Sequence, residues 1–139
     1  MRRSGAEARP GAEKSHPIDE VIAELAQRQE GRLTRAQLAA AGVSDDAIAL
    51  RVASGRLVRL RRGVFAVGGG AETVRGRARA ALLSVGGDGV LSHGWSGAAW
   101  TMCAAYPSSI DVTTPRRLRS RPGIRVHRLP LERDEVRHL

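Results

Sequence analysis

The chain has 139 residues, 23 basic and 14 acidic side chains, and a formal net charge of +9. This length suits one compact domain or two very small ones, and it excludes a large multi-domain enzyme. Hydrophobic residues make up 42% of the chain, which is enough to bury a core, so a wholly disordered chain is not expected. No apolar run approaches the roughly 20 residues that span a bilayer, and the N-terminus lacks the apolar centre of a secretory signal. We therefore expect a cytoplasmic protein.

The excess of positive charge favours a polyanionic partner such as nucleic acid. Lys14 is the only lysine, and the abundance of Arg, Ala and Gly also fits a coding bias, which weakens the argument from charge. Cys103 is the only cysteine, which excludes an intramolecular disulfide and a thiol-rich zinc site. We interpret Cys103 as a small core residue.

Residues 1–16 are rich in Gly, Pro, Ser and mixed charge without periodicity, which predicts a disordered arm. A helix is predicted from Pro17, with Asp19 and Glu20 at its positive dipole end and Gly31 closing it. Its apolar residues recur at helical spacing, namely Ile18, Val21, Ile22, Leu25 and Ala26. One face of this helix is therefore expected to pack on a core.

Capping residues delimit two further short helices. Thr34 and Gln37 match a capping box, which predicts a second helix ended by Gly42. Ser44 caps a third helix, which Gly55 ends. Two helices joined by so tight a turn are typical of a helix-turn-helix.

After the third helix the period changes from helical to β-like. Two short apolar runs, 57–60 and 64–67, flank Arg61-Arg62-Gly63, which predicts a hairpin with a basic tip. Three helices followed by a hairpin form the order of a winged helix-turn-helix, with the hairpin as its wing. We therefore assign residues 17–70 to a winged helix-turn-helix domain.

Four stretches of this predicted domain resemble a known family: Leu33-Thr34-Arg35-Ala36-Gln37-Leu38, Gly42-Val43-Ser44, Val52-Ala53-Ser54-Gly55-Arg56-Leu57 and Leu60-Arg61-Arg62-Gly63-Val64-Phe65-Ala66-Val67. They are similar to the N-terminal winged-helix domain of AbiEi-type antitoxins from type IV toxin-antitoxin systems. The resemblance continues through residues 90–93, 110–113 and 123–128.

The resemblance implies a protein that binds the promoter of its own operon through the winged helix and neutralises a nucleotidyltransferase toxin through the rest of the chain. Some relatives instead carry a C-terminal nuclease-like domain of the very-short-patch-repair type. Such proteins usually continue past the point where this chain stops, at Leu139. We therefore expect residues 71–139 to be the truncated start of an antitoxin C-terminal domain.

The pattern of residues 71–139 predicts a small α+β unit. A helix ended by Gly86-Gly87 has an apolar stripe of Val74, Ala78, Ala81, Leu82 and Val85. Ser92 caps another helix, whose core positions are Trp95, Ala98, Ala99 and Met102. Two paired strands joined by an Arg-rich connection are predicted from the alternation around Ile110, Val112, Ile124 and Val126. The fold class is therefore α+β, a winged helix-turn-helix followed by this unit.

The winged-helix interpretation gives a set of DNA-contact residues on the second and third helices and the wing: Arg35, Ser44, Arg51, Arg56, Arg59, Arg61 and Arg62. For the wing arginines the alternative is a solvated hairpin. Asp45 and Asp46 occupy the first turn of the predicted recognition helix, where base and phosphate contacts concentrate, so nearby arginines must offset their repulsion. These acids also stabilise the helix dipole, and a winged helix used for protein contact or dimerisation would tolerate them better.

A second basic patch is predicted from Arg116, Arg117, Arg119 and Arg121, with a solvated loop as its alternative. His93 follows Ser92 but lacks an acid spaced to orient its imidazole, so no catalysis is expected there. His127 and His138 lie among arginines without a partner at metal-ligand spacing, so we expect no metal ion and no cofactor.

Three functions remain open. The first is a non-enzymatic regulator that binds double-stranded operator DNA, as a homodimer or at paired sites. The second is a module that holds a nucleotidyltransferase toxin without touching DNA. The third is a remnant of a very-short-patch-repair-like nuclease, for which the acids of the second half are too scattered to form a magnesium site.

Overall fold

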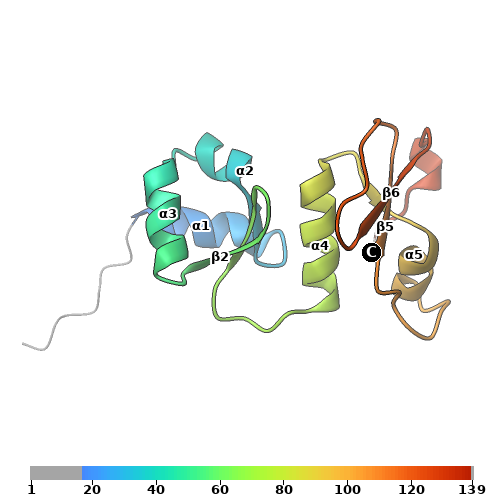
Figure 1. Ribbon diagram of the computed structural model, residues 1–139, viewed down its shortest axis with the longest axis horizontal. Coiled ribbons are helices and arrows are strands. Elements are labelled where there is room, and N and C mark those ends of the chain that lie inside the picture. Colours follow the sequence, from blue (N-terminus) through green and yellow to red (C-terminus); the bar gives the residue numbers. More distant parts are fainter. Residues whose placement is uncertain (1–16, 139) are drawn as a thin grey trace, which may run out of the picture.

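The computed structural model describes residues 17–138, in which three short helices and a hairpin precede a small α+β unit (Figure 1). The first part comprises α1 (Pro17–Gln27), β1 (Arg32–Thr34), α2 (Arg35–Ala40), α3 (Asp45–Ala53), β2 (Leu57–Arg61) and β3 (Val64–Val67). The second part comprises α4 (Val74–Val85), β4 (Val90–Leu91), α5 (His93–Ala99), β5 (Ile110–Thr114), β6 (Ile124–Arg128) and the 3-10 helix η1 (Arg133–Glu135). The predicted α+β class is confirmed, and the predicted arm, 1–16, lies outside the described residues.

The starts of α2 and α3 are fixed by the predicted caps. The Thr34 hydroxyl accepts the backbone N–H of Gln37, and the Gln37 side chain accepts the backbone N–H of Thr34, which completes a capping box. The Ser44 hydroxyl accepts the backbone N–H of Ala47 at 3.2 Å. Gly42 turns the chain between the two helices with a φ of 84°, a conformation that costs other residues strain. Local signals are therefore sufficient to set this helix pair.

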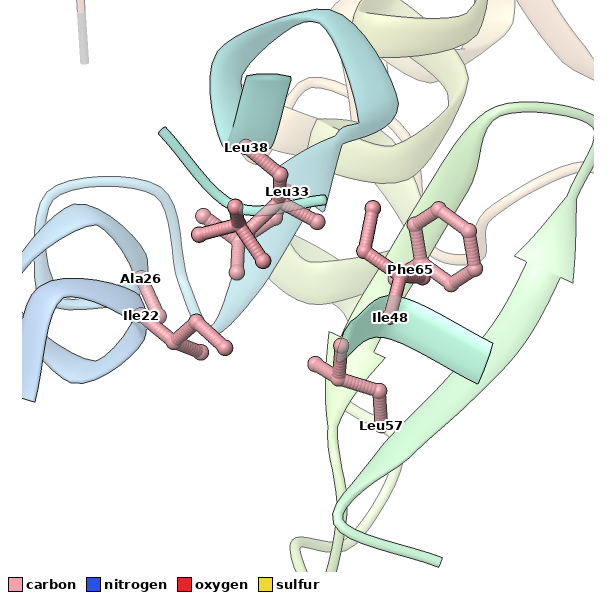
Figure 2. Close-up of a cluster of buried hydrophobic side chains, with 8 residues drawn as sticks. Ile22, Ala26, Leu33, Leu38, Ile48, Leu57 and Phe65 are labelled. Carbon is pink, nitrogen blue, oxygen red and sulfur yellow. The ribbon is translucent and has the colours of Figure 1, made fainter. Parts of the chain in front are cut away.

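The hairpin belongs to a three-stranded antiparallel sheet of order β1-β3-β2. Strand β1, which the sequence analysis did not predict, pairs with β3 so that Leu33 lies opposite Phe65. Both side chains are fully buried, and Figure 2 shows them in one core with residues of all three helices, such as Ile22, Leu38 and Ile48. Burial of this apolar cluster is the main force that holds the helices on the sheet.

The second sheet has the order β4-β5-β6, with β4 antiparallel and β6 parallel to β5. The two predicted strands do pair, but a parallel pair requires the Arg-rich segment 115–123 to travel back along the sheet. Trp95 of α5 and the strand residues Ile110, Val112 and Ile124 form a second core against α4. Helix α4 also packs on β1 and β3, so it stands between the two sheets (Figure 1).

Two predictions for α5 are wrong. The helix ends at Ala99, so Met102, expected at a core position, lies beyond it and is 81% exposed. Cys103, interpreted as a core residue, is exposed for the same reason. Trp95 is buried as expected, and its indole N–H donates to the carbonyl of Pro107 at 2.8 Å.

Within residues 17–138, no helix combines the length and the apolar character needed to cross a membrane.

Candidate nucleic-acid interface

The wing, defined as β2, β3 and the turn between them, carries three of the predicted contact residues. Arg59 is exposed, with its guanidinium 5.7 Å from the centre of the Phe65 ring. Arg62 is exposed at the turn. Arg61 is half-buried, and its Nη1 donates to the carbonyl of Pro122 at 2.7 Å. Two of the three arginines of the wing, Arg59 and Arg62, are therefore accessible to a ligand.

The hydrogen bond from Arg61 to Pro122 brings the wing against the Arg-rich loop, residues 115–123. Arg117 and Arg119 of this loop are exposed, and neither makes an ion pair with any residue of the described segment. The two basic clusters are separate in the sequence, but the fold makes them neighbours. We call the combined set the basic surface; its members are Arg59, Arg61, Arg62, Arg117 and Arg119.

The other two arginines of the loop are held in place by local partners. Arg116 forms an ion pair with Asp88 at 2.8 Å and also donates to the carbonyl of Val85 at 2.6 Å. The side-chain hydrogen bond from Arg116 is the main cause that lowers the pKa of Asp88 below its usual value. Arg121 donates to the carbonyl of Ser84. These bonds anchor the loop to the end of α4 and so fix the position of its exposed arginines.

An open hollow of about 730 Å³ lies between α2, the wing turn and α4. Arg35, Arg62 and Arg79 line it, together with small residues around Gly86 and Gly87. These three arginines give the depression a positive potential that attracts polyanions, and the ion pair of Arg35 with Asp45 offsets part of it. The hollow adjoins the basic surface because Arg62 belongs to both.

Helix α3 uses its predicted contact arginine differently. Arg51 is only 8% exposed, and its Nε donates to Asp19 Oδ1 of α1 at 2.7 Å while its Nη1 donates to the carbonyl of Ala47 at 3.0 Å. Arg56, just after the helix, donates to the other oxygen of Asp19 at 3.0 Å. Arg51 therefore ties α3 to α1, and we remove it from the set of DNA-contact candidates.

The outward face of α3 is acidic and apolar. Asp45 and Asp46 are exposed, and Leu50 is 70% exposed one turn further on. Arg35 offsets part of the negative charge through an ion pair with Asp45 at 3.2 Å, in which both side chains remain accessible. The hydroxyl of Ser44 is occupied by the helix cap. This face is therefore poorly suited to a phosphate backbone.

Sequence reasoning missed one cluster of chemically active side chains. The structure brings His93, Asp111 and His127 together, with one ligand atom from each residue within 4.8 Å of the others. The expectation that His127 has no partner at metal-ligand spacing is wrong, because Asp111 lies 16 positions away in the sequence but on the neighbouring strand. Only the parallel pairing of β5 and β6, which the alternation of apolar residues does not specify, reveals this proximity.

One known family matches a segment in the first part of the chain. Residues 20–68 match the family model described as a transcriptional regulator, AbiEi antitoxin. The matched segment runs from α1 to the end of the wing, and it confirms the resemblance over these residues. No curated protein matches the chain.

Proposed function

Starting from the family match over residues 20–68, we propose that the chain is a DNA-binding, antitoxin-like autoregulator of a type IV toxin-antitoxin operon. The observation that carries this proposal is the hydrogen bond from Arg61 to Pro122, which places the wing and the Arg-rich loop side by side. Exposed guanidinium groups on two neighbouring segments suit the phosphates of a duplex. Binding of this kind needs no catalytic group.

The proposed binding is led by phosphate contacts. Phosphate contacts fix the position of a protein on DNA, whereas contacts to base edges supply most of the sequence information. The basic surface offers the first kind, while Asp45 and Asp46 weaken the approach of α3 to the major groove. We therefore expect a strong dependence on salt and a modest preference for the operator sequence.

A salt titration tests this proposal. Fluorescence anisotropy with a duplex from the region upstream of the gene, and with a shuffled duplex, is measured at rising salt concentration. Each phosphate contact contributes about −0.9 to the slope of log K against log salt concentration. Arg62→Gln is expected to reduce the magnitude of that slope by about 1, whereas Arg133→Gln on η1, at the red end of the chain in Figure 1, leaves it unchanged. Absence of binding even at low salt would reject the proposal.

A second candidate function is toxin binding through α3, favoured by the exposed Leu50 beside Asp45 and Asp46. An exposed leucine flanked by acids suits a protein partner with a basic rim around an apolar pocket. The test is co-purification with a nucleotidyltransferase encoded next to the gene. Leu50→Ser is expected to abolish it, and Leu129→Ser, at another leucine that is 53% exposed, to preserve it. Equal losses would remove α3 as the contact surface.

A further inference from the structure

The cluster of His93, Asp111 and His127 draws on three elements of the second half. His93 begins α5, Asp111 lies on β5 and His127 lies on β6. His127 Nε2 is 2.8 Å from Asp111 Oδ1, and the two imidazole rings stack with their centres 3.9 Å apart. Asp111 is only 5% exposed, His127 is partly buried and His93 is exposed. The cluster is therefore closed on the carboxylate side and open to solvent on the His93 side.

The sheet explains why these side chains meet. Successive residues of a strand point to opposite faces, so the core residues of β5 and β6 leave Asp111 and His127 on the other face. The register pairs Thr113 with His127, and Thr113 lies two residues from Asp111, at the next position on the same face of the sheet. His93 is brought to the same place because the backbone N–H of Ser92 donates to the carbonyl of Asp111 at 3.0 Å. His93 itself has a φ of 51°, an uncommon conformation for a residue with a side chain.

We propose that His93, Asp111 and His127 bind one divalent transition-metal ion of the zinc class. Two imidazoles and one carboxylate form a ligand set typical of zinc sites that keep a fourth, open position. Imidazole nitrogen favours zinc, copper, nickel and iron over magnesium and calcium, so magnesium is not expected to compete. In the absence of the ion, the hydrogen bond between His127 and Asp111 keeps two of the ligands together.

The surroundings orient the ligands. The Ser92 hydroxyl lies 2.9 Å from His93 Nδ1, which leaves Nε2 of that ring as the ligand atom. Tetrahedral zinc with bonds of about 2.0–2.2 Å needs ligand atoms roughly 3.4 Å apart. The longest separation, up to 4.8 Å, must therefore close by about 1–2 Å, and the 2.8 Å between His127 Nε2 and Asp111 Oδ1 must open by roughly 0.6 Å. Rotation of the exposed His93 ring and a small turn of the His127 side chain supply these movements without a change in the backbone of the sheet.

The positive charge of Arg125 opposes binding of a metal ion at this cluster. Arg125 Nη1 is 3.9 Å from Asp111 Oδ1, so it competes for the carboxylate. Its side chain is 65% exposed and free to turn into solvent when the ion binds. Removing this charge is expected to strengthen metal binding, an effect that adventitious binding elsewhere on the surface would not show. The bound ion would fasten the start of α5 to β5 and β6.

The test uses the untagged full chain, stripped of metal, because a polyhistidine tag binds the same ions. Zn²⁺ binding is measured by calorimetry, and Co²⁺ binding by its visible absorption, which reports the coordination geometry. We expect one ion per chain and an upward shift of the melting temperature on adding Zn²⁺. Failure to bind Zn²⁺ at micromolar concentration would overturn the proposal.

The variants separate this site from other histidines. His127→Ala and His93→Asn are expected to weaken binding at least about tenfold, and Arg125→Gln to strengthen it severalfold. Asn tolerates the positive φ of position 93, so His93→Asn keeps the fold even where His127→Ala disturbs it. His138→Ala is the matched control and is expected to bind as the unaltered chain does. Equal losses from His93→Asn and His138→Ala, or no loss from either, would overturn the proposal.

Discussion

Helix α3 and the basic surface both carry arginines, but those arginines have different partners. On α3, the charge of Arg51 is neutralised by the carboxylate of Asp19. On the basic surface, Arg61 donates to a carbonyl and Arg59 lies over an aromatic ring, and neither contact removes the positive charge. The number of arginines in a segment is therefore a poor guide to its affinity for DNA. The partner of each guanidinium decides whether its charge remains available.

This difference sets the expected mode of DNA binding. In many helix-turn-helix proteins the recognition helix supplies the contacts to bases. In this chain the corresponding helix presents Asp45, Asp46 and Leu50, while the available positive charge lies on the wing and the Arg-rich loop.

The largest effect is expected from removing four charges of the basic surface together, by replacing Arg59, Arg62, Arg117 and Arg119 with Gln. Loss of four phosphate contacts reduces the salt slope by about 3–4, and affinity at physiological salt falls by about 100-fold or more. Anisotropy titrations at several salt concentrations measure both quantities.

The control for this variant has the same net charge. Replacing Arg28, Arg75, Arg133 and Arg137 with Gln also lowers the formal charge by four, but these exposed arginines belong to other parts of the surface. Its affinity is expected to fall far less than that of the first variant. If the two variants lose affinity equally, net charge rather than the basic surface governs binding, and the contrast with α3 disappears.

The next largest effect is on stability, from Arg51→Ala. The substitution removes the ion pair between Arg51 and the partly buried carboxylate of Asp19, while the ion pair between Asp19 and Arg56 remains. We expect the free energy of unfolding to fall by roughly 2 kcal/mol. DNA affinity is expected to stay within about twofold, since this side chain does not reach the surface. Urea denaturation and anisotropy give the two values.

Arg51→Met serves as the companion variant, because it keeps much of the apolar stem while removing the charge. It is expected to recover part of the lost stability. A drop in DNA affinity comparable to that of Arg62→Gln would contradict the structural role given to Arg51.

The first half of the fold was largely predictable because its signals are local. Thr34, Ser44 and Gly42 mark helix ends within a few residues of the bonds that they make. Strand β1 escaped notice because its three residues, Arg32–Thr34, are too few to show a period, and it forms only by pairing with β3. The burial of Arg51 also depends on a partner that is distant in the sequence, Asp19, and no local pattern predicts this pair.

The second half was less predictable because its contacts are made between distant positions. Alternating residues indicated β5 and β6, but not that they run parallel. The parallel direction of β6 determines the path of the Arg-rich loop, and it brings His127 within hydrogen-bond distance of Asp111. The sequence therefore predicted which residues are basic, but it did not predict that the wing and the Arg-rich loop lie side by side.

A smaller effect is expected from neutralising the acids of α3 with Asp45→Asn and Asp46→Asn. Removing two negative charges near the duplex is expected to raise DNA affinity by about three- to tenfold. The same change lowers stability by up to about 1 kcal/mol, because acids in the first turn favour the helix dipole. Asp134→Asn with Glu135→Gln, on η1, is the control of equal charge. No difference between the two variants would mean that α3 does not approach the duplex.

The smallest effect concerns the anchor of the Arg-rich loop, where hydrogen bonding from Arg116 lowers the pKa of Asp88. A carboxyl whose pKa is lower in the folded state stabilises the fold above its unfolded value of 3.8, and this contribution disappears as pH falls through the folded value. The stability difference between the unaltered chain and Asp88→Asn should therefore be constant at neutral pH and shrink below 3.8. Urea denaturation near pH 7 and at about pH 3 measures it. Asn keeps an oxygen that accepts the hydroxyl of Thr114, so the comparison isolates the charge of Asp88. A difference that persists at the lower pH would contradict a role for the ionised carboxylate in fixing the loop beside the wing.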